Sequence, residues 1–311
     1  MASYINAETG ELFENATLIT KGQRQVQKEY TEIKEQVDGF KALKGKEQFV
    51  MYLFNAHKSM TDLSPQSAVR LVYLSTFLEY DGAYLKENGK YITRDKMQEL
   101  MVLKPGTFKN FVSEAVSAGY LIKEKKLYKL NTEHFYRGQL SLDAVDRSKK
   151  YIRVYINNLR KLYLSVPQSK HVYLGYIFQL IPYINREWNV ICYNPDETDE
   201  DAIIPMSVGD FCEIVGYNRT NASRFMKEYR DIKFDWNGYH QSFLGYFYNY
   251  EEDKGNMKFF ANPNIFFAGN DYNRVKILKL AFTHKKDYVN TESRETAKLK
   301  DLDCPERLDL Y

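Results

Sequence analysis

The stretch GYNRTNASRFMKEYRD, from Gly216 to Asp231, carries residue types that bind polyanions. Phe225 and Tyr229 mark an inward stripe at helical spacing, so the polar side chains between them face outward. The outward residues are Asn218, Arg219, Thr220, Asn221, Ser223, Arg224 and Lys227, with Glu228 as the one acid beside them. Lysine and arginine bind phosphates, and arginine and asparagine also form paired hydrogen bonds with the edges of guanine and adenine. This face therefore favours contact with a nucleic acid.

The same pattern occurs earlier in the chain, in ITRDKMQELMVLKPGTFKNFVSEA. This segment aligns without a gap with MSVGDFCEIVGYNRTNASRFMKEY, beginning at Ile92 and Met206. Its outward residues are Lys104, Thr107, Lys109, Asn110 and Ser113, a set without an acid. Asn110 and Arg224 occupy equivalent positions, at which Asn110 would read adenine and Arg224 guanine. One such helix is most simply a solvated surface, but its repetition favours DNA binding.

An internal repeat organises the whole chain. VYLSTFLEY at Val72 is matched by VYLGYIFQLIPY at Val172, and NTEHFYRG at Asn131 is matched by NPNIFFAG at Asn262. Each copy has the order helix, short helix, turn, second helix and β-hairpin, which is the order of a winged helix-turn-helix. The sequence predicts a mainly α fold with small β-hairpins, in which two winged helix-turn-helix domains stand in tandem, joined by a long helix.

The repeat also predicts a domain organisation. The expected units are an N-terminal hairpin and helices over 1–60, a first winged-helix domain over 61–140, a linker helix over 141–166, a second winged-helix domain over 167–284 and a charged tail over 285–311. The N-terminal unit combines a hairpin around Thr9-Gly10 with a helix over 22–40.

Basic residues outside the two helices extend the predicted DNA contact. The first hairpin adds Lys123, Lys125 and Lys126, which are expected to contact phosphates. The tip of the second hairpin is acidic, with Glu251, Glu252 and Asp253, which weakens the case for an equivalent contact there. The linker carries Arg147, Lys149, Lys150, Arg153, Arg160 and Lys161. These cations either follow the DNA backbone between two groove contacts or form an ordinary solvated face.

Residues that would indicate an enzyme do not form recognised motifs. The three cysteines have no C-x-x-C spacing, and the five histidines form neither H-x-H nor H-E-x-x-H. GAYLKENGKY is a turn and lacks the spacing of a phosphate loop. We therefore expect no enzymatic activity, no cofactor and no metal. The net charge of +3 requires any nucleic-acid contact to come from local clustering. Without an export signal or a long apolar run, a cytoplasmic protein that does not enter membranes is expected.

Two segments resemble a known family. GYLIKEKKLYKLNTEHFYRG and YINAETGEL are similar to parts of RepL-type replication proteins of Gram-positive plasmids. The tandem arrangement resembles winged-helix DNA-binding proteins of phages and plasmids of Bacillus and its relatives, and is also the plan of theta-type plasmid initiators. The resemblance implies sequence-specific binding of double-stranded DNA at the nucleoid of a bacterial host. A monomer or homodimer would act there, with host transcription or replication proteins as candidate partners.

The sequence leaves three functions open. The preferred function is a phage or mobile-element transcriptional regulator. A replication initiator that binds repeated origin sites would show the same DNA specificity, and the RepL resemblance favours it. An interaction scaffold whose winged helices bind protein instead of DNA belongs to another class, and would show no steep dependence of DNA affinity on salt.

Overall fold

The computed structural model describes residues 4–5, 9–10, 12–13, 21–24, 47–54, 60–138, 150–236, 239–248, 257–269, 271–280, 282 and 284–285. Among these residues, 43% are helical and 24% lie in strands, so the described part of the chain has a mixed α/β fold. One four-stranded antiparallel sheet is accompanied by smaller two- and three-stranded sheets.

The four-stranded sheet joins the two copies of the repeat. Its strands, in spatial order, are β14 (Phe266–Phe267), β9 (Lys150–Tyr155), β3 (Phe49–Phe54) and β8 (Phe135–Tyr136). The two central strands pair along their whole length, from Phe49 opposite Tyr155 to Phe54 opposite Lys150. β8 pairs with β3 and β14 pairs with β9 on the outer edges. Each copy of the repeat therefore contributes one central and one outer strand.

The outer strands begin in the same way in both copies. The Asn131 side-chain oxygen accepts a hydrogen bond from the backbone N–H of Glu133 at 3.0 Å. The Asn262 side-chain oxygen accepts from the N–H of Asn264 at 2.8 Å. Asparagine commonly makes this turn, because its short side chain can replace a backbone acceptor. The matched segments NTEHFYRG and NPNIFFAG thus form equivalent structure in the two copies.

The first copy carries three helices and two hairpins. They are α2 (Pro65–Ser75), β4 (Lys86–Glu87), β5 (Lys90–Tyr91), α3 (Arg94–Leu100), α4 (Pro105–Ser117), β6 (Leu121–Glu124) and β7 (Leu127–Leu130). Thr93 is the N-cap of α3, and its hydroxyl accepts from the N–H of Lys96 at 3.4 Å. β4 and β5 confirm that GAYLKENGKY is a turn, since Asn88 and Gly89 at its tip both have positive φ, as a tight hairpin requires.

The second copy repeats the helices and enlarges the strands. It contains α5 (Ile156–Ser165), α6 (His171–Gln179), α7 (Val208–Ile214), α8 (Ala222–Asp231), β10 (Lys233–Trp236), β11 (Tyr239–Ser242), β12 (Leu244–Tyr248), β13 (Met257–Ala261), α9 (Tyr272–Leu280) and β15 (His284–Lys285). Short 3-10 helices cover Gln168–Lys170, Ile181–Tyr183, Glu200–Ala202 and Arg219–Asn221. A capping box starts α7, because Ser207 N donates to Asp210 at 2.7 Å and Asp210 N donates to the Ser207 hydroxyl at 3.3 Å.

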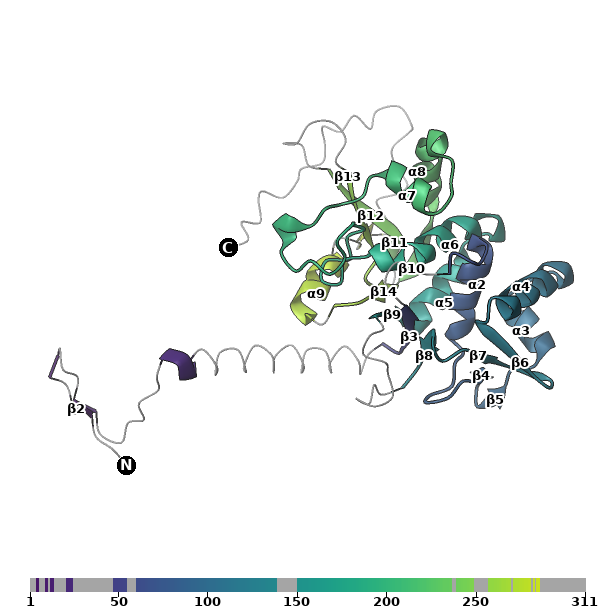
Figure 1. The fold of residues 1–311 in the computed structure, drawn as a ribbon, viewed down its shortest axis with the longest axis horizontal. Coiled ribbons are helices and arrows are strands. Elements are labelled where there is room, and N and C mark those ends of the chain that lie inside the picture. Colours follow the sequence, from purple (N-terminus) through teal and green to yellow (C-terminus); the bar gives the residue numbers. More distant parts are fainter. Residues whose placement is uncertain are drawn as a thin grey trace.

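Helix α2 of the first copy and its equivalent in the second copy, α6, pack directly against each other. α2 and α6 form the most extensive helix–helix contact among the described residues, and they lie between the α3–α4 pair and the α7–α8 pair (Figure 1). Gly175 allows the close approach, since a Cβ added to it would stand 1.7 Å from the carbonyl oxygen of Pro65. One hydrophobic core includes buried residues of both copies, from Val50 to Phe266. α9 covers Tyr155 and Phe267 in a smaller, separate cluster.

The predicted fold class is wrong. The chain is not mainly α with two winged helix-turn-helix domains joined by a long helix, because a shared antiparallel sheet connects the two copies. In the described part of the predicted linker, Lys150–Tyr155 form a strand and only Ile156–Ser165 are helical. Ile152 and Ile156 fit helical spacing, but the aromatic and β-branched residues of KYIRVY favour a strand once a partner strand is present.

The ends of the chain are described only in part. The predicted N-terminal hairpin is confirmed by β1 (Tyr4–Ile5) and β2 (Leu12–Phe13), which pair antiparallel. Residues 21–24 are helical, and the rest of the predicted helix over 22–40 lies outside the described residues. The same holds for the acidic hairpin tip at 251–253 and for the tail beyond residue 285.

The turn between the second and third helices has the same backbone conformation in both copies. Val102 has a φ of 53° between α3 and α4, and Gly216 has a φ of 68° at the equivalent position between α7 and α8. Glycine adopts this region easily, whereas a β-branched side chain is strained there. Val102 is 61% exposed, so it gains little burial in return. The first turn therefore stores strain that the second does not.

We predict that Val102→Gly raises the free energy of unfolding by about 0.5–1 kcal/mol, because a left-handed conformation costs an ordinary residue about 1–2 kcal/mol. Gly216→Val should lower the free energy of unfolding by about 1–2 kcal/mol, because valine is strained at a φ of 68°. Steric overlap does not add to this cost, since a Cβ at Gly216 would have no atom within 4 Å. Urea unfolding measures both changes. Val116→Gly, at an exposed helical valine, is the control and should be destabilising; an equal loss for Val102→Gly would contradict the argument.

Candidate nucleic-acid interface

The outer face of α4 presents the residues that the sequence singled out in the first copy. Phe108, Phe111, Val112 and Ala115 are buried on the inner face. Lys104, Lys109, Asn110 and Ser113 are exposed, and Thr107 is half-buried at the edge of the face. Within the described residues, no hydrogen bond or ion pair engages the side chains of Lys109, Asn110 or Ser113. These groups are available to a partner.

The corresponding residues of the second copy divide into two groups. Asn218 and Thr220 shape the start of α8, because the Asn218 side-chain oxygen accepts from the Thr220 N–H at 3.0 Å and from its hydroxyl at 2.8 Å. Arg219 pairs with Glu213 at 2.5 Å, and this hydrogen bond raises the pKa of the guanidinium. The exposed side chains that have no such partner in the described structure are Asn221, Ser223, Arg224 and Lys227.

One acid of each helix is turned toward the N-terminal end of the first helix of its own copy. Glu114 accepts hydrogen bonds from the Ser64 backbone N–H, from the Ser64 hydroxyl at 3.0 Å and from the Ser67 hydroxyl, at the start of α2. At the equivalent position Glu228 pairs at 3.3 Å with Lys170, which precedes α6. Carboxylates are stabilised at helix N-termini and beside cations. The negative charges of Glu114 and Glu228 are therefore compensated at the starts of α2 and α6, and not at the outer faces of α4 and α8.

Asp231 is a second acid of α8 and lies at the end of the helix. It is exposed, and its carboxylate stands 3.6 Å from the same Lys170 ammonium. This second pairing reduces the negative charge at the end of the outer face.

The basic hairpin β6–β7 lies next to α4 in the first copy. Lys123, Lys125 and Lys126 are exposed at its tip, and Lys125 has a φ of 54° in the turn. Glu124, the acid among them, pairs with Lys129 and accepts a hydrogen bond from the Tyr84 hydroxyl at 2.9 Å. These partners lower the pKa of Glu124 and compensate its charge. The hairpin tip therefore presents three lysines.

The cations of the predicted linker have mainly structural contacts. Arg153 is buried and donates to the carbonyl oxygens of Ala268 and Gly269, at 3.2 and 2.7 Å. Arg160 donates to Thr76 and stacks 3.8 Å from the centre of the Phe77 ring. The proposal that these two arginines follow a DNA backbone is not supported by their positions. Lys161 is exposed on α5, whereas residues 147 and 149 lie outside the described part.

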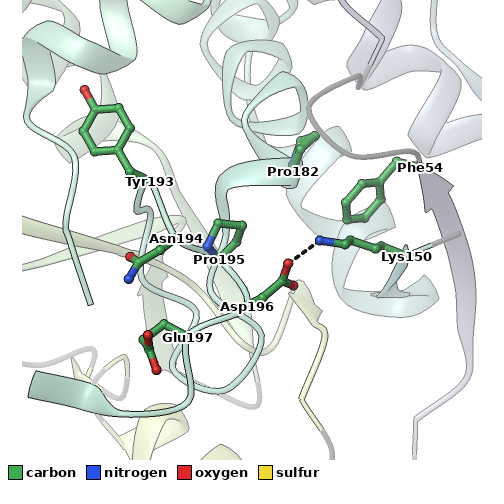
Figure 2. Close-up of a pocket in the computed structure, with 8 residues that line it drawn as sticks. All are labelled: Phe54, Lys150, Pro182, Tyr193, Asn194, Pro195, Asp196 and Glu197. Carbon is green, nitrogen blue, oxygen red and sulfur yellow. Dashed lines mark hydrogen bonds and ion pairs between the residues drawn. The ribbon is translucent and has the colours of Figure 1, made fainter. Parts of the chain in front are cut away.

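A pocket of about 400 Å3 lies beside Lys150, the first residue of β9 (Figure 2). It is lined by Phe54, Lys150, Pro182, Tyr193, Asn194, Pro195, Asp196 and Glu197. Lys150 pairs there with Asp196, which also contacts Arg186 at 2.9 Å. Lys150 is thus a third linker cation with a partner in the protein. The charges of Lys150 and Asp196 are therefore compensated within the protein.

The described residues contain no group that indicates catalysis by a thiol or a metal. Burial raises the pKa of the Cys192 thiol to about 12 and also raises that of Cys212, which disfavours the reactive thiolate form. In the same part of the chain, no three His, Cys, Asp or Glu side chains are placed to hold a metal ion. His134 packs on the Tyr120 ring, with 4.5 Å between ring centres.

Sequence reasoning missed a second pocket, at the end of α8. It includes Arg230, Lys233 and Tyr246, which come from one helix and two strands. No local spacing brings these residues together, so only the strand pairing reveals their proximity. The alternation of aromatic residues in LGYFYNY was the one available signal, and it is typical of a strand.

No known protein family matches the chain, and no curated protein or solved structure shows detectable similarity to it. Separately, none of the helices in the described ranges is long and apolar enough to cross a lipid bilayer.

We predict that Glu114→Gln lowers the free energy of unfolding by about 1–2 kcal/mol, because it removes the charge from hydrogen bonds at the start of α2. Chemical denaturation measures the change. Glu99→Gln is the matched control, since Glu99 is exposed and pairs only with Lys96 at 2.8 Å, and it should change stability by less than about 0.5 kcal/mol. Equal effects of the two substitutions would show that the cap contributes little.

Proposed function

We propose that this protein binds double-stranded DNA sequence-specifically through the outer faces of α4 and α8. The observation that carries the proposal is the orientation of Glu114 and Glu228, whose charges are compensated beside the first helix of each copy. This orientation leaves the outer faces of the two helices without a carboxylate at these equivalent positions. An acid-free face beside three exposed lysines has the electrostatic character that a phosphate backbone attracts.

The residue types suit two kinds of contact. An α-helix fits the major groove, where asparagine pairs with adenine and arginine with guanine. Asn110 and Arg224, at equivalent positions of the two helices, are proposed to read base edges. Lys109 and Lys227, together with Lys123, Lys125 and Lys126 of the β6–β7 hairpin, are proposed to contact phosphates. Arg219 is assigned to the support of α8, because Glu213 already holds it.

Two copies in one chain would read two neighbouring sites. The antiparallel pairing of β3 with β9 gives the chain an internal pseudo-twofold arrangement, so a monomer carries two related helices. The proposed role is a phage or mobile-element transcriptional regulator that acts at the bacterial nucleoid. Replication of a plasmid that carries the bound sequence, when this protein is supplied, would assign it to replication initiation instead.

Selection from a random duplex library should enrich one composite motif, and affinity for that motif should fall steeply with salt. Each phosphate contact contributes about 0.9 to the slope of log affinity against log salt. The triple variant Lys123→Gln, Lys125→Gln, Lys126→Gln should therefore reduce the slope by about 2–3. Lys276→Gln, at an exposed lysine of α9, is the control and should leave it unchanged. Weak binding whose affinity does not change with salt concentration would contradict DNA recognition and favour a protein-binding scaffold.

Base reading and phosphate contact make different predictions for single residues. Arg224→Ala should relax specificity at one base position, with a loss of about 1–3 kcal/mol on the selected motif and little loss on random DNA. Lys125→Ala should weaken binding to both DNAs by similar factors, because a phosphate contact carries no sequence information. Fluorescence anisotropy on the two duplexes separates these outcomes. If Arg224→Ala weakens both duplexes equally, Arg224 contacts phosphate and reads no base.

A further inference from the structure

The pocket at the end of α8 encloses about 490 Å3 between the helix and the strands that follow it. Met226, Tyr229 and Arg230 line it from α8, while Leu244 and Phe260 line it from β12 and β13. A volume of this size accommodates a small organic molecule, since ligand pockets commonly measure about 300–1,000 Å3.

The floor of the pocket is apolar. Met226, Leu244, Phe260 and Phe282 are all less than a tenth exposed, and the Phe260 and Phe282 rings meet edge to face at 4.9 Å. The Tyr229 hydroxyl donates to the carbonyl oxygen of Tyr173, so it is already satisfied by the protein. A ligand that enters this pocket would therefore bury a hydrocarbon or aromatic body.

The rim of the pocket is basic. Arg230 and Lys233 are exposed, no acid is among the lining residues, and no ion pair involves either cation within the described structure. The Arg230 guanidinium lies 5.7 Å from the centre of the Tyr246 ring. This contact limits the freedom of the arginine and holds its charge at the pocket mouth. Arg230 and Lys233, which have no acidic partner, suit the charged group of an anion. The apolar floor below them suits its hydrocarbon part.

Two comparisons within the molecule support this assignment. In the pocket of Figure 2 the lysine already pairs with Asp196, so that pocket offers no uncompensated positive charge. In the first copy of the repeat, Val116 stands at the position equivalent to Arg230, and Ala115 at the position of Tyr229. The basic rim and aromatic floor therefore belong to the second copy alone and are not needed to build the repeated helix.

We propose that this pocket binds a small organic anion whose carboxylate, sulfonate or phosphate contacts Arg230 and Lys233 while its aromatic or branched apolar body lies on Leu244 and Phe260. The site goes beyond the proposed DNA contact, since Arg230 and Lys233 have no assigned part in it. Binding is tested without DNA, so its failure leaves the DNA proposal untouched.

Anilinonaphthalene sulfonate serves as the anionic probe and uncharged N-phenylnaphthylamine as its neutral counterpart. The anionic probe should bind at one molecule per chain, with its fluorescence enhanced by the apolar floor. Arg230→Gln with Lys233→Gln should weaken the anionic probe by about tenfold or more and change the neutral probe by less than about twofold. Lys276→Gln is the control and should affect neither probe. Circular dichroism and the unfolding midpoint establish that each variant is folded.

A second variant tests the location. Ser242 lines the pocket and is half-buried, so Ser242→Trp should fill the cavity and abolish saturable binding of both probes. An unchanged dissociation constant for the anionic probe in the double glutamine variant overturns the proposal, as does equal weakening of the two probes. Retention of both probes by a folded Ser242→Trp protein also overturns it. If Ser242→Trp does not fold, the double glutamine variant decides alone.

Discussion

The antiparallel pairing of β3 with β9 is the interaction on which the arrangement of the molecule depends. These strands are equivalent in the two copies of the repeat, and their pairing fixes the direction of one copy relative to the other. The contact of α2 with α6 has the same consequence on one side of the sheet, where Gly175 lets the backbone of α6 approach Pro65. Together they place α4 and α8 as related helices of one chain, which two independently packed units would not ensure.

The repeat also explains why surface charge is distributed as it is. α4 and α8 each contain an acid at the same position, and in both copies this acid points to the start of the preceding long helix. The partners differ, because Glu114 meets the hydroxyl groups of Ser64 and Ser67 whereas Glu228 meets Lys170. The two glutamates point in the same direction although their partners differ. This indicates that the geometry of the helix pair sets their orientation, and that the outer faces owe their positive character to that orientation.

Local signals predicted much of the helical structure and little of the sheet. The caps at Thr93 and Ser207, the inward stripes and the Asn88–Gly89 turn depend on neighbouring residues, and the structure contains all of them. β9 depends on a distant partner strand, so its residues were assigned to a helix. The exposure of Lys109, Asn110, Arg224 and Lys227 was predictable from helical spacing. The buried roles of Arg153 and Arg160 were not, because long cationic side chains are read as surface until their partners are known.

The two copies share a frame and differ in what they add to it. The first adds a short hairpin with three lysines at its tip, and the second adds strands that close a pocket behind the end of α8. Arg230 stands on the same helix as Arg224 and Lys227 but faces the pocket mouth, where Tyr246 holds it. The second copy is therefore the one in which the proposed ligand pocket and the proposed DNA-binding face share one helix.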